Sequence, residues 1–281
     1  MHLLAMLTIT ALAVIIRYQP MSSSPKWSPR WYRTLFLFLF PALLLFSTAS
    51  TILYMGCHGQ MLGVRAGSLG CVISGTLIAF ALGSLLKLAY SCNHALRQLA
   101  NLEQQTIGST TARILATDFP YSAQMGFWQS KLIVSQGLLD VLDQEHLAAV
   151  IAHEQAHLFY RDTFWFFWLG WVRSFSFWLP NTEILWQELL LLRELRADRK
   201  ASASVDFLLL AESLLTVAKA PLESTSVWCV SLNDSQIGDR LNERIDCLLE
   251  QKKPVAAIKW HRWSWICLLF LPLLTIPLHF N

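Results

Sequence analysis

The sequence predicts a mainly α-helical integral membrane protein with about four transmembrane helices and a cytosolic domain that contains a small β-element. Of its 281 residues, 54% are hydrophobic and only 15% are charged, and the mean hydropathy is +0.41. These values are wrong for a soluble globular protein. Two long stretches carry no charge at all, and the remaining polar sequence contains both helical and strand patterns.

The four predicted spans differ in length. Residues 35–55 and residues 66–86 are free of charge, and each reaches the roughly 20 residues that a spanning helix needs. Residues 263–280 are about long enough, and two prolines there predict kinks rather than a break. Residues 3–16 are shorter. Because basic residues follow this apolar run and none precede it, the pattern favours a signal anchor over a cleaved signal peptide.

The basic residues predict which loops face the cytosol. The segment between the second and third spans carries only Arg65, whereas the segment between the first two carries Arg17, Lys26, Arg30 and Arg33. We therefore expect a multi-pass membrane protein whose polar domain faces the cytosol, with the lipid bilayer as a partner. Three regions follow: residues 1–91 with three transmembrane helices, a cytosolic domain over residues 92–262, and a last span over residues 263–281.

Charge and cysteine usage exclude other classes of protein. The net charge of +3 is too small and too scattered to predict direct binding of nucleic acid. The six cysteines occur singly, without a CxxC pair. They are predicted to be small apolar packing residues rather than a disulfide framework or a cysteine zinc site.

The cytosolic domain is predicted to be helical with a little strand. Residues 112–118 and residues 130–137 are short runs bounded by turn residues and are typical of strands, while residues 93–105 have helical spacing. A long amphipathic helix is expected over residues 140–159. The aromatic run of residues 163–180 is too polar at Arg173 for a further span, so it is expected as a helix or hairpin at the membrane face.

A metal site is indicated by His153, Glu154 and His157, which form an HExxH pattern. On a helix, residues four apart lie on one face, so both imidazoles can point at one metal ion with the glutamate beside them. Two buried structural histidines are the alternative. The apolar surroundings of Glu154 argue against that alternative, because a buried carboxylate without a partner or a task is costly.

A catalytic zinc keeps three protein ligands and one position for water, so a third ligand must lie downstream. No histidine occurs between His157 and His261, which leaves a carboxylate. The helical run of residues 189–202 favours Glu194 from a set that consists of Asp162, Glu183, Glu188, Glu194 and Asp198. Glu194 and Asp198 share one helix face, so one can bind metal while the other accepts a hydrogen bond from a ligand histidine.

The motifs AVIAHEQAHLFYRD (residues 149–162) and ELRAD (residues 194–198) resemble those of the membrane-embedded gluzincin peptidases. Two branches share them: the M56 signal transducers of the BlaR1/MecR1 type, and the M48 family with the HtpX heat-shock protease and the CAAX prenyl protease. The resemblance covers residues 112–249. The order of three spans, zinc domain and last span favours M56, although no external penicillin-binding domain is present.

The resemblance implies a zinc metalloendopeptidase in which zinc is bound by His153, His157 and Glu194. Glu154 would be the general base and Asp198 would orient a ligand histidine. A protein substrate is expected to pair with the strand formed by Lys131, Leu132, Ile133, Val134 and Ser135, taken as an edge strand of the family's kind.

Three functions remain open at this stage. The first is cleavage of a cytosolic protein in a signalling pathway, with a BlaI-type transcriptional repressor as the substrate that M56 implies. The second is membrane-protein quality control of the M48 type. The third is a receptor or scaffold with a structural zinc site, against which an intact Glu154 argues, because a structural site has no use for a base.

The predicted orientation can be tested by cysteine labelling. In a background that otherwise lacks cysteine, a cysteine placed at Gly59 is expected to react with an impermeant maleimide in intact cells, and one at Ser23 is expected to stay protected. Equal labelling at the two positions would contradict the orientation.

Overall fold

The computed structural model describes residues 1–21, 27–58, 60–61, 64–65, 67–223, 234–249 and 260–280. The chain forms two compact units. The first unit comprises Met1–Tyr90, Trp168–Leu190 and Val255–Asn281, and the second comprises Ser91–Phe167 and Leu191–Pro254. The positions proposed for labelling, Ser23 and Gly59, lie outside the described residues.

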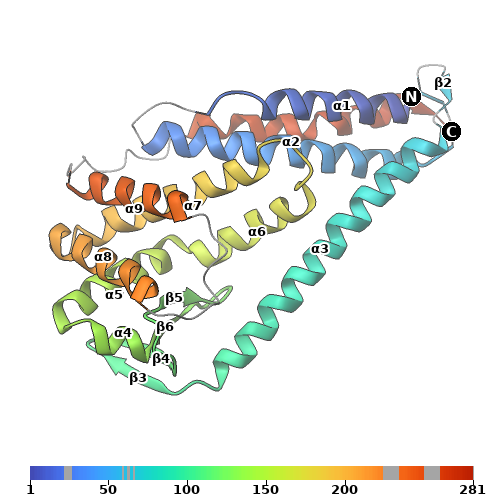
Figure 1. Cartoon of the computed structure of the whole chain (residues 1–281). Coiled ribbons are helices and arrows are strands. Elements are labelled where there is room, and N and C mark those ends of the chain that lie inside the picture. The colour runs from blue at the N-terminus through green and yellow to red at the C-terminus, as the bar shows by residue number, and fades with distance from the viewer. Residues whose placement is uncertain are drawn as a thin grey trace. The chain divides into compact units, whose positions relative to one another are not determined.

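Helices α1 (His2–Arg17), α2 (Trp27–Met55) and η2 (Trp260–Leu278) pack alongside one another in the first unit (Figure 1). Helix α3 (Ser68–Ala100) starts in this unit. A short sheet of order β2-β1-β7 joins the hairpin of β1 (Gln60–Met61) and β2 (Val64–Arg65) to β7 (His279–Phe280). This sheet ties the segment between α2 and α3 to the C-terminal end of the described chain.

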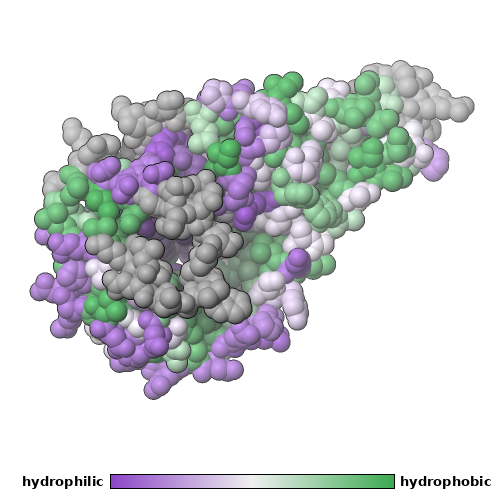
Figure 2. Space-filling view, in the orientation of Figure 1, coloured by the Kyte–Doolittle hydropathy of each residue, from purple (hydrophilic) through white to green (hydrophobic). Residues whose placement is uncertain are grey.

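Among the described residues, two helices, α2 and α3, are long and apolar enough to cross a membrane by length and composition. They contain the predicted spans 35–55 and 66–86. The most apolar stretch of α3 is only 22% buried, and Figure 2 shows hydrophobic residues gathered over its N-terminal part. The exposed large side chains of this helix include Leu69, Val72, Ile73, Phe80, Leu82 and Leu86. Such an apolar face is the kind that lipid covers.

The first and last predicted spans are shorter apolar helices, in α1 and in Trp263–Pro277 of η2. Instead of a kinked α-helix, the last one is a 3₁₀ helix with Pro272 and Pro277 inside it. A 3₁₀ helix rises about 2.0 Å per residue against 1.5 Å for an α-helix, so this short run extends about 30 Å.

Arg17 and Arg30, two of the basic residues from which the orientation is predicted, also make contacts within the first unit. Arg17 is almost fully buried and donates to the Phe38 carbonyl oxygen at 2.9 Å and to Thr182 Oγ1 at 3.1 Å. Arg30 Nε donates to Glu188 Oε1 at 2.8 Å. These contacts attach α1 and α2 to α7 (Thr182–Ala201), whose first residues belong to this unit. The buried charges are therefore hydrogen-bonded or paired, as their burial requires.

The second unit is built on a four-stranded sheet of order β3-β4-β6-β5. Strands β4 (Thr110–Leu115) and β6 (Lys131–Ser135) pair in parallel and confirm the two predicted strands. Strands β3 (Gln104–Ile107) and β5 (Ser122–Met125) pair antiparallel with β4 and β6 and were not expected. The helix predicted over residues 93–105 is wrong at its end, because α3 stops at Ala100 and the chain enters β3.

The helices that follow the sheet differ from the prediction at their start. The predicted helix over residues 140–159 is two helices, α4 (Gln136–Val141) and α5 (Gln144–Tyr160). They separate because the Asp143 carboxylate caps α5 by accepting from the backbone N–H groups of Glu145 and His146, at 3.1 and 2.9 Å. After α5 come α6 (Asp162–Phe175), α7, α8 (Phe207–Glu223) and α9 (Asp234–Leu249).

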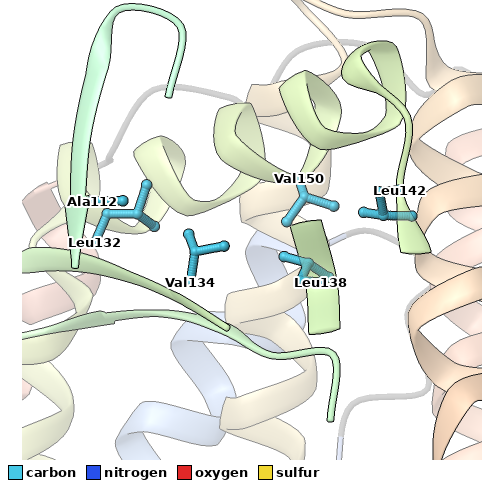
Figure 3. Close-up of a cluster of buried hydrophobic side chains, with 6 residues drawn as sticks. All are labelled: Ala112, Leu132, Val134, Leu138, Leu142 and Val150. Atoms are coloured by element: carbon cyan, nitrogen blue, oxygen red, sulfur yellow. The ribbon is translucent and has the colours of Figure 1, made fainter. Parts of the chain in front are cut away.

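The core of the second unit lies between the sheet and these helices (Figure 3). Val134 of β6 and Val150 of α5 face each other across it, with Leu138 of α4 beside them. The cluster of buried side chains is made up of Ala112, Leu132, Val134, Leu138, Leu142 and Val150. This packing fixes α5, the helix of the HExxH pattern, against the sheet.

The strand predicted to bind substrate is not an edge strand in the structure. The strand formed by Lys131, Leu132, Ile133, Val134 and Ser135 is β6, which is hydrogen-bonded to β4 on one side and to β5 on the other. A strand with two partners has no backbone groups left for a third. In the part of the chain that the structure describes, the strand with an open edge on this side of the sheet is β5.

Replacing Leu138, which is fully buried, by alanine is expected to lower the free energy of unfolding by about 2–5 kcal/mol, because the substitution leaves a cavity in the core. Val141→Ala, in the same helix but 50% exposed, is the matched control and should change stability by about 0.5 kcal/mol or less. Denaturant unfolding of the detergent-solubilised protein measures both. Equal losses would contradict the packing described.

Candidate metal centre

Helix α5 positions the two histidines of the pattern. It ends at Arg161, which adopts the left-handed conformation at φ 53° and turns the chain directly into α6. His153, Glu154 and His157 lie on the buried side of α5 and are each less than 10% exposed. Burial of three ionisable side chains on one helix is costly unless each of them has a hydrogen-bonding or charged partner.

Three acceptor atoms from two helices meet at one point. His153 Nε2 lies 3.1 Å from His157 Nε2 and 3.2 Å from Glu194 Oε2, and His157 Nε2 lies 3.6 Å from the same oxygen. A tetrahedral zinc with ligand bonds of about 2.0–2.1 Å sets its donor atoms about 3.3 Å apart. The spacing and the donor types of His153, His157 and Glu194 therefore fit a single zinc ion.

The other ring nitrogen of each histidine faces a carboxylate. His157 Nδ1 is hydrogen-bonded to Asp162 Oδ2 at 2.7 Å, and His153 Nδ1 lies 2.8 Å from Asp198 Oδ1, at ion-pair distance but without hydrogen-bond alignment. Each carboxylate favours a proton on Nδ1, so the Nε2 lone pair is directed at the common point. Lone pairs so close together require a cation between them.

The surrounding charges favour positive charge at that point. Burial alone would lower the pKa of His153, but the charges and contacts of Asp198 and Glu194 outweigh burial and raise the pKa to about 9. Burial would likewise raise the pKa of Glu194, yet its contacts with His153 and His157 and the nearby arginines hold that pKa well below its ordinary value. The centre thus favours anionic oxygen together with bound positive charge.

Arginine side chains hold the carboxylates in place. Arg244 of α9 donates to both oxygens of Asp198, at 2.7 and 2.8 Å. Arg193 donates twice to Glu194 Oε1, at 2.9 and 2.7 Å, so Oε2 is the oxygen that faces the histidines. Arg196 is bound to Asp162. Bidentate arginine contacts fix a carboxylate in orientation as well as in charge.

Glu154 follows His153 directly in α5 and is 6% exposed. Ser122 Oγ, on the open-edged strand β5, donates to Glu154 Oε1 at 2.8 Å. One carboxylate oxygen is therefore anchored to the strand, while the other oxygen has no protein donor among the described residues. With one oxygen held, the Glu154 carboxylate is suited to exchange a proton with a small molecule that lies between β5 and the three acceptor atoms.

The structure brings together all five residues that the sequence assigned to the centre: His153, Glu154, His157, Glu194 and Asp198. The role of Asp162 was missed. It was weighed as a third ligand, but its carboxylate contacts Nδ1 of His157 instead of the common point. Its position directly after the Arg161 cap was the available signal, because a sharp helix end returns the next side chain toward the last turn.

Two further members of the centre come from far along the chain. Ser122 precedes Glu154 by 32 residues and Arg244 follows Asp198 by 46. Neither carried a metal-site pattern in the sequence, since serine and arginine are common surface residues. Only the fold shows that both contact the centre.

A model of Peptidase family M48 matches residues 93–221, slightly less than half of the chain. The matched segment includes the HExxH helix and Glu194. The match supports the M48 branch of the resemblance, and with it a metallopeptidase; the M56 assignment is not confirmed. No curated protein and no solved structure matches the chain.

Asp162→Asn is expected to weaken zinc binding about 10- to 100-fold, because the amide orients His157 less well and does not raise the basicity of its ring. Asp140→Asn, an exposed residue of α4 that contacts Gln136, is the matched control and should bind zinc as the parent does. Competition with a chromophoric chelator measures the affinity. A parent-like affinity for the Asp162 variant would remove the orienting role.

Proposed function

We propose that the chain is a membrane-anchored, zinc-dependent endopeptidase that hydrolyses peptide bonds in a protein substrate. The observation that carries this proposal is the meeting of His153, His157 and Glu194 within 4.8 Å, with Glu154 beside them on the same helix. The M48 match of the segment that contains these residues supports it. Zinc is the metal that this family uses and that this donor set fits.

Bound zinc supplies Lewis-acid chemistry, which makes water a nucleophile at neutral pH and polarises a carbonyl. Glu154 takes the proton of the attacking water at its free carboxylate oxygen and later delivers that proton to the leaving amide nitrogen. Ser122 holds the other oxygen and keeps the carboxylate aimed. Asp162 and Asp198 keep the two imidazoles in the tautomer that binds metal.

The substrate is proposed to lie extended along the open edge of β5. Ser122 of this strand touches Glu154, so a chain paired there passes the ligand residues. Backbone pairing holds a substrate without demanding a sequence. At the far end of β5 the rings of Phe127 and Phe164 are 5.0 Å apart and Trp128 is 73% exposed, so apolar substrate side chains would meet aromatic surface there.

Between the candidate roles, quality control of membrane proteins now has the stronger support, because the matched family is M48. Cleavage of a cytosolic repressor remains the second candidate and rests on the order of spans predicted for M56. A receptor with a structural zinc site is the weakest, since Ser122 aims Glu154 at a point where only a reaction needs a base. Both enzyme roles place the second unit in the cytosol, as the basic residues predict.

The central test separates metal binding from catalysis. The purified parent should hold about one zinc per chain; His157→Ala and Glu194→Gln should lose the metal, because a catalytic site has only three protein ligands. Glu154→Gln should keep the zinc and lose about 10²- to 10⁴-fold in peptidase activity, the range that a general base supplies.

Glu145→Gln, on the exposed side of the same helix, is the matched control and should keep both metal and activity. Metal analysis and cleavage of an unfolded protein substrate provide the two measurements. Full zinc retention by both ligand variants would contradict the metal assignment. An active Glu154→Gln would contradict the assignment of Glu154 as the general base.

A further inference from the structure

We propose that Cys57 and Cys71 are a redox pair that closes to a disulfide, with His2 as the proton acceptor for Cys71. The sequence analysis treated the cysteines as apolar packing residues, because 14 positions and a loop separate these two in the chain. The fold of the first unit packs Cys57 against the buried cluster that contains Cys71. The inference is independent of the zinc centre.

The two cysteines stand at the facing ends of two helices. Cys57 follows the last residue of α2 by two positions, past Gly56 at φ 85°, and Cys71 is in the first turn of α3. Both belong to one packed cluster, in which Cys71 is 4% exposed and Cys57 is half-buried. Cys57 is therefore the thiol that a reagent in solution reaches, and Cys71 is the partner held behind it.

His2 completes the group from a third helix. Its side chain is 1% exposed, and its Nδ1 lies 3.9 Å from the sulfur of Cys71. Gly70 makes this approach possible: a Cβ at Gly70 would lie only 2.6 Å from the Cβ of His2. A close helix contact that depends on a glycine next to the cysteine directs the imidazole to the thiol, and a thiol needs such a base because the thiolate is its reactive form.

The reaction requires a disulfide oxidant. The Cys57 thiolate attacks one sulfur of the oxidant, which forms a mixed disulfide and releases the first thiol of the oxidant. The Cys71 thiol passes its proton to His2, and the resulting thiolate attacks the Cys57 sulfur and releases the second thiol. Two cysteine thiols are oxidised by two electrons, and one oxidant disulfide is reduced to two thiols.

Closure would join the end of α2 to the start of α3 and would close the loop that carries β1 and β2. The basic residues predict that this loop lies outside the cytosol, where disulfides form and persist. A link across this loop stabilises mainly by restricting the unfolded chain.

The test is made on the full-length protein in cells. Free thiols are blocked with N-ethylmaleimide before lysis, and the digested protein is analysed by mass spectrometry with and without reduction. We expect a linked Cys57–Cys71 peptide that disappears on reduction, and we expect two fewer maleimide adducts in unreduced than in reduced denatured protein. Complete blocking of both cysteines without reduction would overturn the proposal.

Three variants provide the controls. Cys57→Ser and Cys71→Ser should each abolish the linked peptide, whereas Cys92→Ser, also in α3, should keep it. After reduction, reclosure of the purified protein by oxidised glutathione should be about tenfold slower in His2→Gln than in the parent at neutral pH, since less Cys71 thiolate forms. An unchanged rate would remove His2 from the reaction, and a linked peptide that survives in Cys71→Ser would overturn the pairing itself.

Discussion

The second unit is organised around three acceptor atoms that cannot be left facing one another without a positive charge. The Nε2 atoms of His153 and His157 and the Oε2 atom of Glu194 lie 3.1–3.6 Å apart. Their lone pairs repel unless a proton or a metal ion lies between them. Burial alone would lower the pKa of His153, but the charges and contacts of Asp198 and Glu194 raise it to about 9. The surrounding charges can be understood as means of keeping these atoms in this arrangement.

Each ligand residue contacts a charged side chain, and the carboxylates among these partners are themselves bound by arginines. Asp198 faces His153 and accepts hydrogen bonds from Arg244. Asp162 faces His157 and accepts a hydrogen bond from Arg196. Such a chain of contacts restricts the rotamers of the ligands before a metal binds, and it lowers the free-energy cost of ordering them at binding. Burial of so many charges is tolerated because carboxylates and guanidinium groups alternate through the cluster.

The first unit differs from the second, because polar groups are scarce there and apolar surface is abundant. Buried Arg17 donates hydrogen bonds to α2 and α7, and Arg30 pairs with Glu188 of α7, while the exposed side chains of α3 are mainly apolar. Basic side chains that indicate orientation in the sequence therefore also bind helices together. In the same unit His2 Nδ1 lies 3.9 Å from the sulfur of Cys71, and Cys57 packs against the cluster that contains Cys71.

The sequence by itself determined the local features of this protein: the uncharged lengths of α2 and α3, the strands β4 and β6, and the shared helix faces of His153 with His157 and of Glu194 with Asp198. These follow from the periods of a helix and a strand and from hydropathy, which act over a few residues. Only the tertiary structure decided that β6 lies inside the sheet, that Asp162 contacts His157, that Ser122 and Arg244 reach the centre, and that Cys57 packs against the cluster of Cys71. Those contacts join segments far apart in the chain, and they depend on how whole elements pack, which no local pattern encodes.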